Sequence, residues 1–341
     1  MKIRRTIIKF LMVLFACMLI GQPMGMNLQI ISAEEEDQIF SNNSWTNQYE
    51  WNWDDTVKSS LELQENGNYE RVEWTNDKLV VEHYSSSFNL IDSSIIDASS
   101  YTPTGAKYVL WGGYYSGENY KFVVTGQENS AEDDGVAVVR VSKYSVTWQY
   151  LDCVEYSGIN TRLPFEAGSL RMTELNGELW IRTCHQMYQS EDGLCHQANM
   201  TFCIRESDLN KIKSSTEVSN YSTGYVSHSF NQFIINDGEN IYGADHGDAY
   251  PRGIVAKNIN HISSIYSYEA MLFNGNTGDN YTGATFSGFE TADYGQKLIF
   301  AGTVADQEKS FPSSNKNNYG AKNLWVGIVP VDGTETKNIY L

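Results

Sequence analysis

Proline and cysteine are both scarce in this chain, with 6 and 5 residues among 341, and basic residues are outnumbered by acidic ones, 24 to 42. The shortage of positive charge disfavours nucleic acid and anionic membrane surfaces as partners, because an acidic protein surface repels their phosphates. The cysteines lack the CxxC and CxxxH spacings of structural zinc sites. Neutral sugars, cations and basic peptides remain as ligand classes.

Several familiar catalytic motifs are also missing. No GxSxG nucleophile elbow is present, and neither GxGxxG nor a Walker loop follows a predicted strand. Beyond the N-terminal region there is no long segment with helical periodicity. Glycine (27 residues) and aromatic residues (13%, including 22 tyrosines) are abundant instead. Together with many Val, Ile and Thr residues, this composition favours twisted β-sheets.

The N-terminal region predicts export. Four basic residues precede an apolar stretch from Phe10 to about Ile20, and Ser32 and Ala33 provide small residues ahead of an acidic run. This order is typical of a cleavable signal peptide, which we assign to residues 1–33. An uncleaved anchor is an alternative, although the apolar stretch is about half of the roughly 20 residues that a span needs. Lipidation at Cys17 is a second alternative.

Export predicts a secreted, extracellular protein with no membrane association after signal cleavage. The remaining chain has a formal charge of −22 and four cysteines, Cys153, Cys184, Cys195 and Cys203. An even number of cysteines in an oxidising compartment favours disulfides. We predict a bridge between Cys184 and Cys195, which would close the loop between them. The alternative is that all four are reduced thiols.

Four segments of the chain are similar to one another, each with a tight turn followed by an apolar strand. These strands are residues 121–125, 178–182, 240–244 and 297–301, and their aligned residues Phe122, Leu179, Ile241 and Leu298 are spaced by 57, 62 and 57 positions. Asn176–Gly177 and Asp237–Gly238 precede two of them and are dipeptides typical of hairpin turns. Each unit continues with a third and a fourth strand, and residues 79–84 with 88–96 match such a pair.

Four antiparallel strands repeated at this spacing predict an all-β fold, a β-propeller of about five four-stranded blades. In unit length and strand order the chain resembles Kelch-like and other secreted bacterial β-propeller proteins over residues 65–341. The resemblance is architectural, since the Kelch double glycine does not recur and Trp111–Tyr114 contains the single example. A β-sandwich is the alternative.

The expected organisation is a signal peptide (1–33), a flexible acidic lead-in (34–64) and the propeller (65–341). The first unit has no evident innermost strand, so an incomplete ring is one interpretation. The alternative is that the aromatic stretch Tyr49–Trp53 provides the missing strand.

The loops that join second to third strands are long, and all of them lie at one end of their blades. Loops on a rigid scaffold concentrate binding residues, so we predict a ligand-binding face there. The candidate residues on this face and in the strand leading to it are Gln127, Glu128, His185, His228, Asn231, Asp245, His246, Asp248 and Arg252.

The segment Asp245–Asp248 combines two carboxylates and an imidazole, with Arg252 close behind, which suits acid/base chemistry or cation binding. We predict no cofactor. Calcium at residues 274–280 is an alternative, although this loop lacks the spaced acids of a calcium loop. A metal site of His185, His196 and His246 is another.

We therefore expect a secreted, non-catalytic recognition module that binds a glycan or a cell-surface protein through this face. Aromatic platforms with a few polar groups suit sugars, whose faces are apolar and whose edges carry hydroxyls. The alternative function is a carbohydrate-active hydrolase or lyase that pairs Asp248 with Asp134 or Glu128 on the same face. A scaffold that acts through protein contacts alone is a third interpretation.

Overall fold

The computed structural model describes residues 56–96, 107–166, 168–216, 219–221, 224–226, 229–247, 252–260, 267–273, 275, 282–305 and 323–341. All of these belong to one compact unit, residues 40–341. The predicted signal peptide lies outside the described residues. Within them the regular elements are all β-strands, and no helix is long and apolar enough to cross a membrane.

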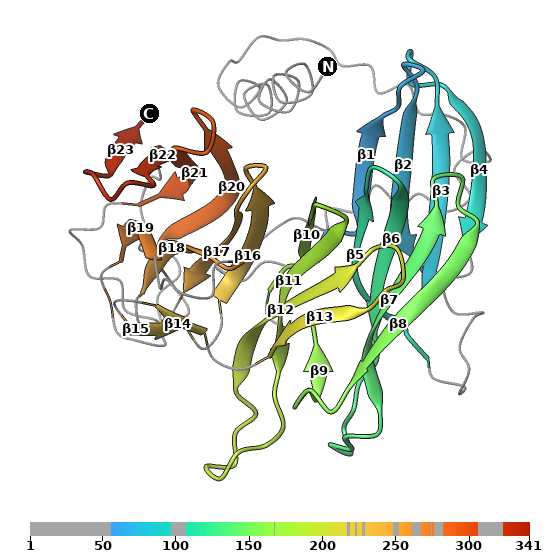
Figure 1. The fold of residues 1–341 in the computed structure, drawn as a ribbon, viewed down its shortest axis with the longest axis horizontal. Coiled ribbons are helices and arrows are strands. Elements are labelled where there is room, and N and C mark those ends of the chain that lie inside the picture. The colour runs from blue at the N-terminus through green and yellow to red at the C-terminus, as the bar shows by residue number, and fades with distance from the viewer. Residues whose placement is uncertain are drawn as a thin grey trace. The chain divides into compact units, whose positions relative to one another are not determined.

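The described strands form five antiparallel sheets whose strands follow one another in chain order (Figure 1). The first contains β1 (Ser59–Leu63), β2 (Tyr69–Thr75), β3 (Lys78–Tyr84) and β4 (Leu90–Ile96); the second β5 (Leu110–Ser116), β6 (Tyr120–Gly126), β7 (Ala137–Ser145) and β8 (Tyr150–Ser157). The third contains β10 (Arg171–Leu175), β11 (Glu178–Gln186), β12 (Gln197–Arg205) and β13 (Lys211–Ser215), with the short β9 (Leu163–Pro164) paired to β11.

The fourth sheet contains β16 (Ser229–Asn236), β17 (Ile241–Gly247), β18 (Gly253–Asn258) and β19 (Ser267–Leu272), and the fifth β20 (Ala284–Ala292), β21 (Lys297–Val304), β22 (Asn323–Pro330) and β23 (Lys337–Tyr340). A separate ribbon, β14 (Ser219–Tyr221) with β15 (Gly224–Val226), lies between the third and fourth sheets in the chain.

This arrangement confirms the predicted fold, a β-propeller of five four-stranded blades. The four predicted second strands are β6, β11, β17 and β21. The residues that align the repeats, Phe122, Leu179, Ile241 and Leu298, are all fully buried. The repeat is detectable because each of these four blades places a core residue at the same point of its second strand.

The predicted hairpin turns are also present. Leu175 pairs with Glu178, and Asn176 and Gly177 between them have φ values of 54° and 76°. Two successive residues with positive φ define a two-residue turn that matches the twist of the strands it joins. Gly238 has a φ of 101° in the equivalent turn between β16 and β17.

Neighbouring sheets pack face to face, and the core is divided among the spaces between them. Representative buried residues are Val72, Leu79 and Val123 between the first and second sheets; Val124, Ile181 and Phe202 between the second and third; Trp180 and Ile234 between the third and fourth; and Ala256, Phe286 and Phe300 between the fourth and fifth. The first strands β5, β10, β16 and β20 contact one another in chain order. The fourth strands β4, β13 and β23 are largely exposed, so the first strands are innermost.

Two expectations about the first blade are wrong. This blade does not lack its innermost strand, because β1 pairs with β2 from Ser59 to Leu63. The propeller also begins earlier than residue 65, since β1 lies inside the predicted lead-in. The first blade is harder to recognise because β2 has three charged residues among its seven and so does not resemble the aligned second strands. The stretch Tyr49–Trp53 lies outside the described residues.

Candidate functional site

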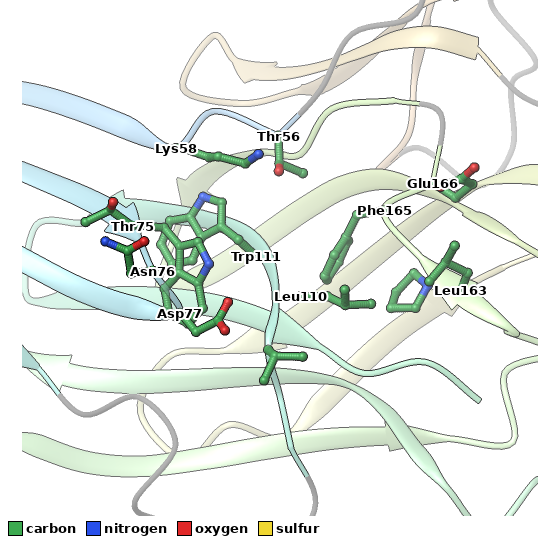
Figure 2. A pocket seen from close by; sticks show the side chains of 13 residues that line it. Thr56, Lys58, Thr75, Asn76, Asp77, Leu110, Trp111, Leu163, Phe165 and Glu166 are labelled. Carbon is green, nitrogen blue, oxygen red and sulfur yellow. The ribbon is translucent and has the colours of Figure 1, made fainter. Parts of the chain in front are cut away.

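An open pocket of about 520 Å³ lies among the first three sheets (Figure 2). Its floor is apolar and includes Leu110, Leu163 and Phe165, and its rim is polar and includes Asn76, Asp77 and Glu166. Figure 2 shows Asp77 on the side of Trp111, and Glu166 on the other side beyond Phe165. The site thus combines an apolar surface with hydrogen-bonding groups on two walls.

Two tryptophans form one wall of this pocket. The rings of Trp74 at the end of β2 and Trp111 in β5 are stacked, with centroids 5.1 Å apart and planes 13° apart. The indole N–H of Trp111 donates to the Val57 carbonyl at 2.8 Å, and the backbone N–H of Trp74 donates to the Lys58 carbonyl at 2.7 Å. These bonds fix the segment 56–58 along the pocket.

A two-residue turn keeps the pocket open. Asn76 and Asp77 join β2 to β3 with φ values of 50° and 57°, and Thr75 pairs directly with Lys78. The other walls come from the residues that lead into β1, β5 and β10. In an antiparallel blade, the start of strand one and the connection from strand two to strand three lie at the same end. The pocket is therefore on the face that carries the long loops, beside the shortest connection of that face.

Two glycines make room for the aromatic floor. A Cβ on Gly112 would approach Phe165 to 2.9 Å, and a Cβ on Gly126 would approach Pro164 to 2.7 Å and Phe165 to 2.8 Å. Real Cβ contacts are longer, so Phe165 can pack here only because both positions are glycine. This explains the first glycine of the single Trp-Gly-Gly-Tyr segment of the sequence.

The predicted site residue Asp245 lies instead in a buried polar network between the third and fourth sheets. Its carboxylate forms an ion pair with Arg182, in which Nε donates to Oδ1 at 3.2 Å and Nη2 donates to Oδ2. Asn199 Nδ2 and Ser229 Oγ also donate to Oδ1, at 3.2 and 3.1 Å. Asp245 is 0% exposed, so its carboxylate is enclosed by its partners and is out of reach of a ligand.

The same network includes the predicted residue Asn231 and reaches the fifth sheet. Ser169 Oγ donates to Asn231 Oδ1 at 2.8 Å, and Asn231 Nδ2 donates to the Phe286 carbonyl at 2.6 Å. Gln232 accepts from the Ser169 backbone N–H at 2.7 Å and donates to the Ser229 carbonyl at 2.6 Å. These bonds connect three sheets, and they give Asn231 a structural role at the inner strands.

Two of the predicted histidines, His185 and His246, are buried in separate places. His185 Nδ1 lies 2.6 Å from Thr161 Oγ1, and Nε2 lies 2.8 Å from the Thr216 carbonyl oxygen. Burial lowers the pKa of His185 to about 4, so the ring is neutral. His246 Nε2 contacts Thr282 Oγ1 at 2.7 Å, between the rings of Phe230 and Phe273.

A metal site of the three histidines is not formed. His196 pairs with the exposed Asp192 at 2.7 Å, away from the partners of the other two. Among the residues that the structure describes, no group of three His, Cys, Asp or Glu side chains is arranged to hold a metal ion. The calcium alternative at 274–280 lies outside the described residues, apart from Gly275.

Of the remaining predicted residues, the structure describes Gln127, Glu128 and Arg252, and each has partners in its own surroundings. Gln127 donates to the Ala137 carbonyl at 2.6 Å, and Glu128 accepts from the Ser130 hydroxyl in its own loop. Arg252 is 7% exposed and packs near Gly275. His228 and Asp248 lie outside the described residues.

The predicted Cys184–Cys195 disulfide is corrected by the structure, in which both residues are free thiols. Cys184 in β11 is fully buried, and its thiol donates to the Glu166 carbonyl at 2.7 Å. Cys195 lies in the loop that returns to β12, where its sulfur accepts from Arg162 Nη1 at 3.1 Å. The two side chains are held by different partners. Cys153 and Cys203 are free as well.

Comparison with known proteins assigns no family. No family model matches the chain, and no curated protein is similar to it. Solved structures that are similar include hydrazine synthase from Kuenenia stuttgartiensis, with 10% identity over 84% of this chain and 67% of that one and a TM-score of 0.45. An exo-β-1,3-galactanase from Phanerochaete chrysosporium has 9% identity over 84% and 65%, with a TM-score of 0.40.

TolB from Acinetobacter baumannii has 8% identity over 81% of this chain and 52% of that one, with a TM-score of 0.40. The chain thus spans about two thirds or less of these proteins. At such identities and TM-scores, the similarities show no function for this chain.

Proposed function

We propose that this protein is a secreted, non-catalytic recognition module that binds a neutral glycan in the pocket lined by Trp74 and Trp111. The observation that carries the proposal is the combination, in one solvent-open pocket, of an aromatic and aliphatic floor with amide and carboxylate groups on the rim. The proposed pocket lies on the binding face predicted from sequence, but it is lined by residues other than those predicted there.

The shape and chemistry of the pocket support a sugar ligand. Sugar rings have apolar C–H faces that pack on aromatic and aliphatic side chains, and hydroxyl edges that need polar partners. A volume of about 520 Å³ lies within the range of small-molecule sites. The acidic surface of the chain, with a formal charge of −22 after removal of residues 1–33, disfavours strongly anionic ligands.

Asp77 and Glu166 provide the test of this site. Asp77 is exposed at the tip of its turn, Glu166 is half-buried, and they line the pocket from different elements. Asp77→Asn retains a residue type that tolerates positive φ, and Glu166→Gln retains the shape of the side chain. Both replace a strong hydrogen-bond acceptor by a weaker one with little change in packing.

The experiment screens the protein on a glycan array and then measures affinity for the strongest ligands by titration calorimetry. We expect each substitution to weaken binding by about tenfold, the loss of one charge-assisted hydrogen bond. Glu65→Gln, in the turn between β1 and β2 at the opposite end of the same blade, is the matched control and should bind as the wild type does. Absence of binding to any neutral glycan, or equal affinities for all variants, would overturn the proposal.

A glycoside hydrolase is the second candidate, because the pocket has two carboxylates on its rim. Two acids about 5–10 Å apart are the requirement for glycosidic cleavage. The catalytic pair predicted from sequence is Asp248 with Asp134 or Glu128. Asp248 lies outside the described residues, whereas Asp134 accepts from the Tyr188 hydroxyl at 3.2 Å and Glu128 from Ser130. Release of reducing sugars that is lost in both Asp77→Asn and Glu166→Gln would identify an enzyme, and binding without release would identify a recognition module.

A further inference from the structure

Two glutamates meet on the third sheet, at the end of the blades opposite the pocket. Glu174 lies in β10, and Glu206 directly follows β12. The Glu206 backbone N–H donates to the Gly177 carbonyl at 2.9 Å, which fixes its position beside the turn between β10 and β11. The backbone N–H of Glu118, in the turn between β5 and β6, donates to Glu174 Oε1 at 2.8 Å. This bond connects the second sheet to the third.

Each of these carboxyl groups has a buried oxygen that lacks a donor. Glu206 is 4% exposed, and neither Glu206 Oε1 nor Glu174 Oε2 has a hydrogen-bond partner among the described residues. The two side chains are within hydrogen-bond reach of each other. Both are acceptors when ionised, so they can bond only if one of them holds a proton.

The positive charge of Lys143 offsets the pair only in part. Lys143 Nζ donates to the backbone carbonyls of Glu206 and Ser207, at 2.9 and 3.0 Å, and lies 4.8 Å from the centre of the Tyr120 ring. The carboxylate of Glu118 adds a third negative charge, and the buried phenol of Tyr115 adds none near neutral pH. Burial and the neighbouring Glu174 raise the pKa of Glu206 to about 7, and burial also raises the pKa of Glu174.

We propose that Glu174 and Glu206 share one proton as a carboxylic acid–carboxylate pair, and that this pair holds the second and third blades together in a pH-dependent way. In acid the proton lies between the two carboxyl groups, supplies the missing hydrogen bond and leaves one negative charge. As the proton dissociates to water, the buried carboxylate of Glu206 and the half-buried carboxylate of Glu174 face each other beside Glu118. The repulsion then loosens the β5–β6 turn from the third sheet.

The direction of the effect follows from proton linkage. The pKa of Glu206 is raised in the folded protein above the model value of 4.5, so the folded state binds the proton more tightly than the unfolded state. The stabilisation of the folded state by this proton is complete below about pH 4.5 and is lost as pH rises to about 7. Within this range the unfolding equilibrium constant should increase by at most about tenfold per pH unit.

The test measures unfolding by denaturant from pH 4.5 to 8 for the wild type and for Glu206→Gln. The amide of glutamine donates to Glu174 at every pH, so the variant should lack the pH-dependent contribution of the shared proton to stability. The wild-type stability relative to the variant should therefore fall as pH rises. Asp208→Asn, an exposed acid two residues away, should follow the wild type. A constant difference between the wild type and Glu206→Gln would overturn the proposal.

Two further measurements test the proposal even if Glu206→Gln does not fold. The carboxyl carbon signals of the ¹³C-labelled wild-type protein should include a glutamate that titrates near pH 7 and is absent in Glu174→Gln, and its absence from the wild type would refute the shared proton. Calcium is the second probe. If it raises the melting temperature of the wild type at pH 8 and leaves that of Glu174→Gln unchanged, the pair is a cation site and the proposal is wrong.

Discussion

Arg182 of β11 and Asp245 of β17 form an ion pair that joins the third and fourth blades, and their side chains are 1% and 0% exposed. The guanidinium contacts both carboxylate oxygens, and its Nη1 donates to Thr201 Oγ1 at 2.8 Å. Each charge is thus removed from water and compensated by the other. An ion pair in such a setting is costly to separate, because removal of one partner leaves the other charge buried and unpaired.

Asp245→Ala should therefore destabilise the protein by about 3–5 kcal/mol, and any loss of ligand binding should follow from unfolding. The free energy of unfolding by denaturant measures the effect. The exposed pair Arg205–Asp208, with side chains 50% and 54% exposed, is the control. Asp208→Ala should have little effect on stability, because water screens a surface pair. Equal losses in the two variants would contradict the assignment of Asp245 as a structural residue.

The thiols should differ in reactivity in a defined order. Burial raises the pKa values of Cys184 and Cys203, so these thiols should be alkylated only after denaturation. Cys195 is partly exposed and lies against the guanidinium of Arg162, so it should be alkylated in the folded protein. Peptide mapping after iodoacetamide treatment gives the order. A peptide that links Cys184 to Cys195 would instead restore the disulfide predicted from sequence.

The repeat in the sequence predicted the blades because it is a local property. Each of the four aligned second strands has an apolar segment that follows a tight turn, so Leu179 and Ile241 are recognisable without knowledge of the rest of the fold. The functional site depends on which blades are neighbours and on which loop is short. Asp245 resembled a ligand-binding residue because nothing in the sequence indicates that Arg182, 63 positions earlier, is its partner. Loop length does not indicate the pocket, because the turn beside it has only two residues.

Gly126→Ala should show how closely the pocket floor is packed. The added methyl group would lie 2.7 Å from Pro164, 2.8 Å from Phe165 and 2.9 Å from the Val138 carbonyl oxygen. Relief of these contacts should cost about 1–3 kcal/mol of stability and move Phe165 into the pocket, which would weaken ligand binding. Gly288→Ala is the control, because its nearest contact would be an ordinary 3.5 Å to Ala301. Unchanged stability and affinity in Gly126→Ala would show that Phe165 has room to shift.

His185 should make the protein less stable in acid. Its Nε2 lies 2.8 Å from the Thr216 carbonyl oxygen, which requires a hydrogen on that nitrogen, and burial lowers the pKa of the ring to about 4. The unfolded chain, with an ordinary histidine pKa of about 6.5, therefore binds a proton that the folded state excludes. This contribution to stability is complete above about pH 6.5 and is lost as pH falls toward about 4, by at most about tenfold in the unfolding constant per pH unit.

Denaturant unfolding of the wild type and His185→Gln from pH 7.5 to 4 isolates the contribution of His185 to the pH dependence of stability, because glutamine retains a donor for Thr216 and does not titrate. The stability of the wild type relative to the variant should fall as pH decreases. This direction is opposite to that expected for Glu206, whose contribution increases in acid, so the two groups are distinguished by the sign of the difference. If the wild-type stability relative to His185→Gln rises in acid, His185 is charged in the folded protein and must face a carboxylate or solvent.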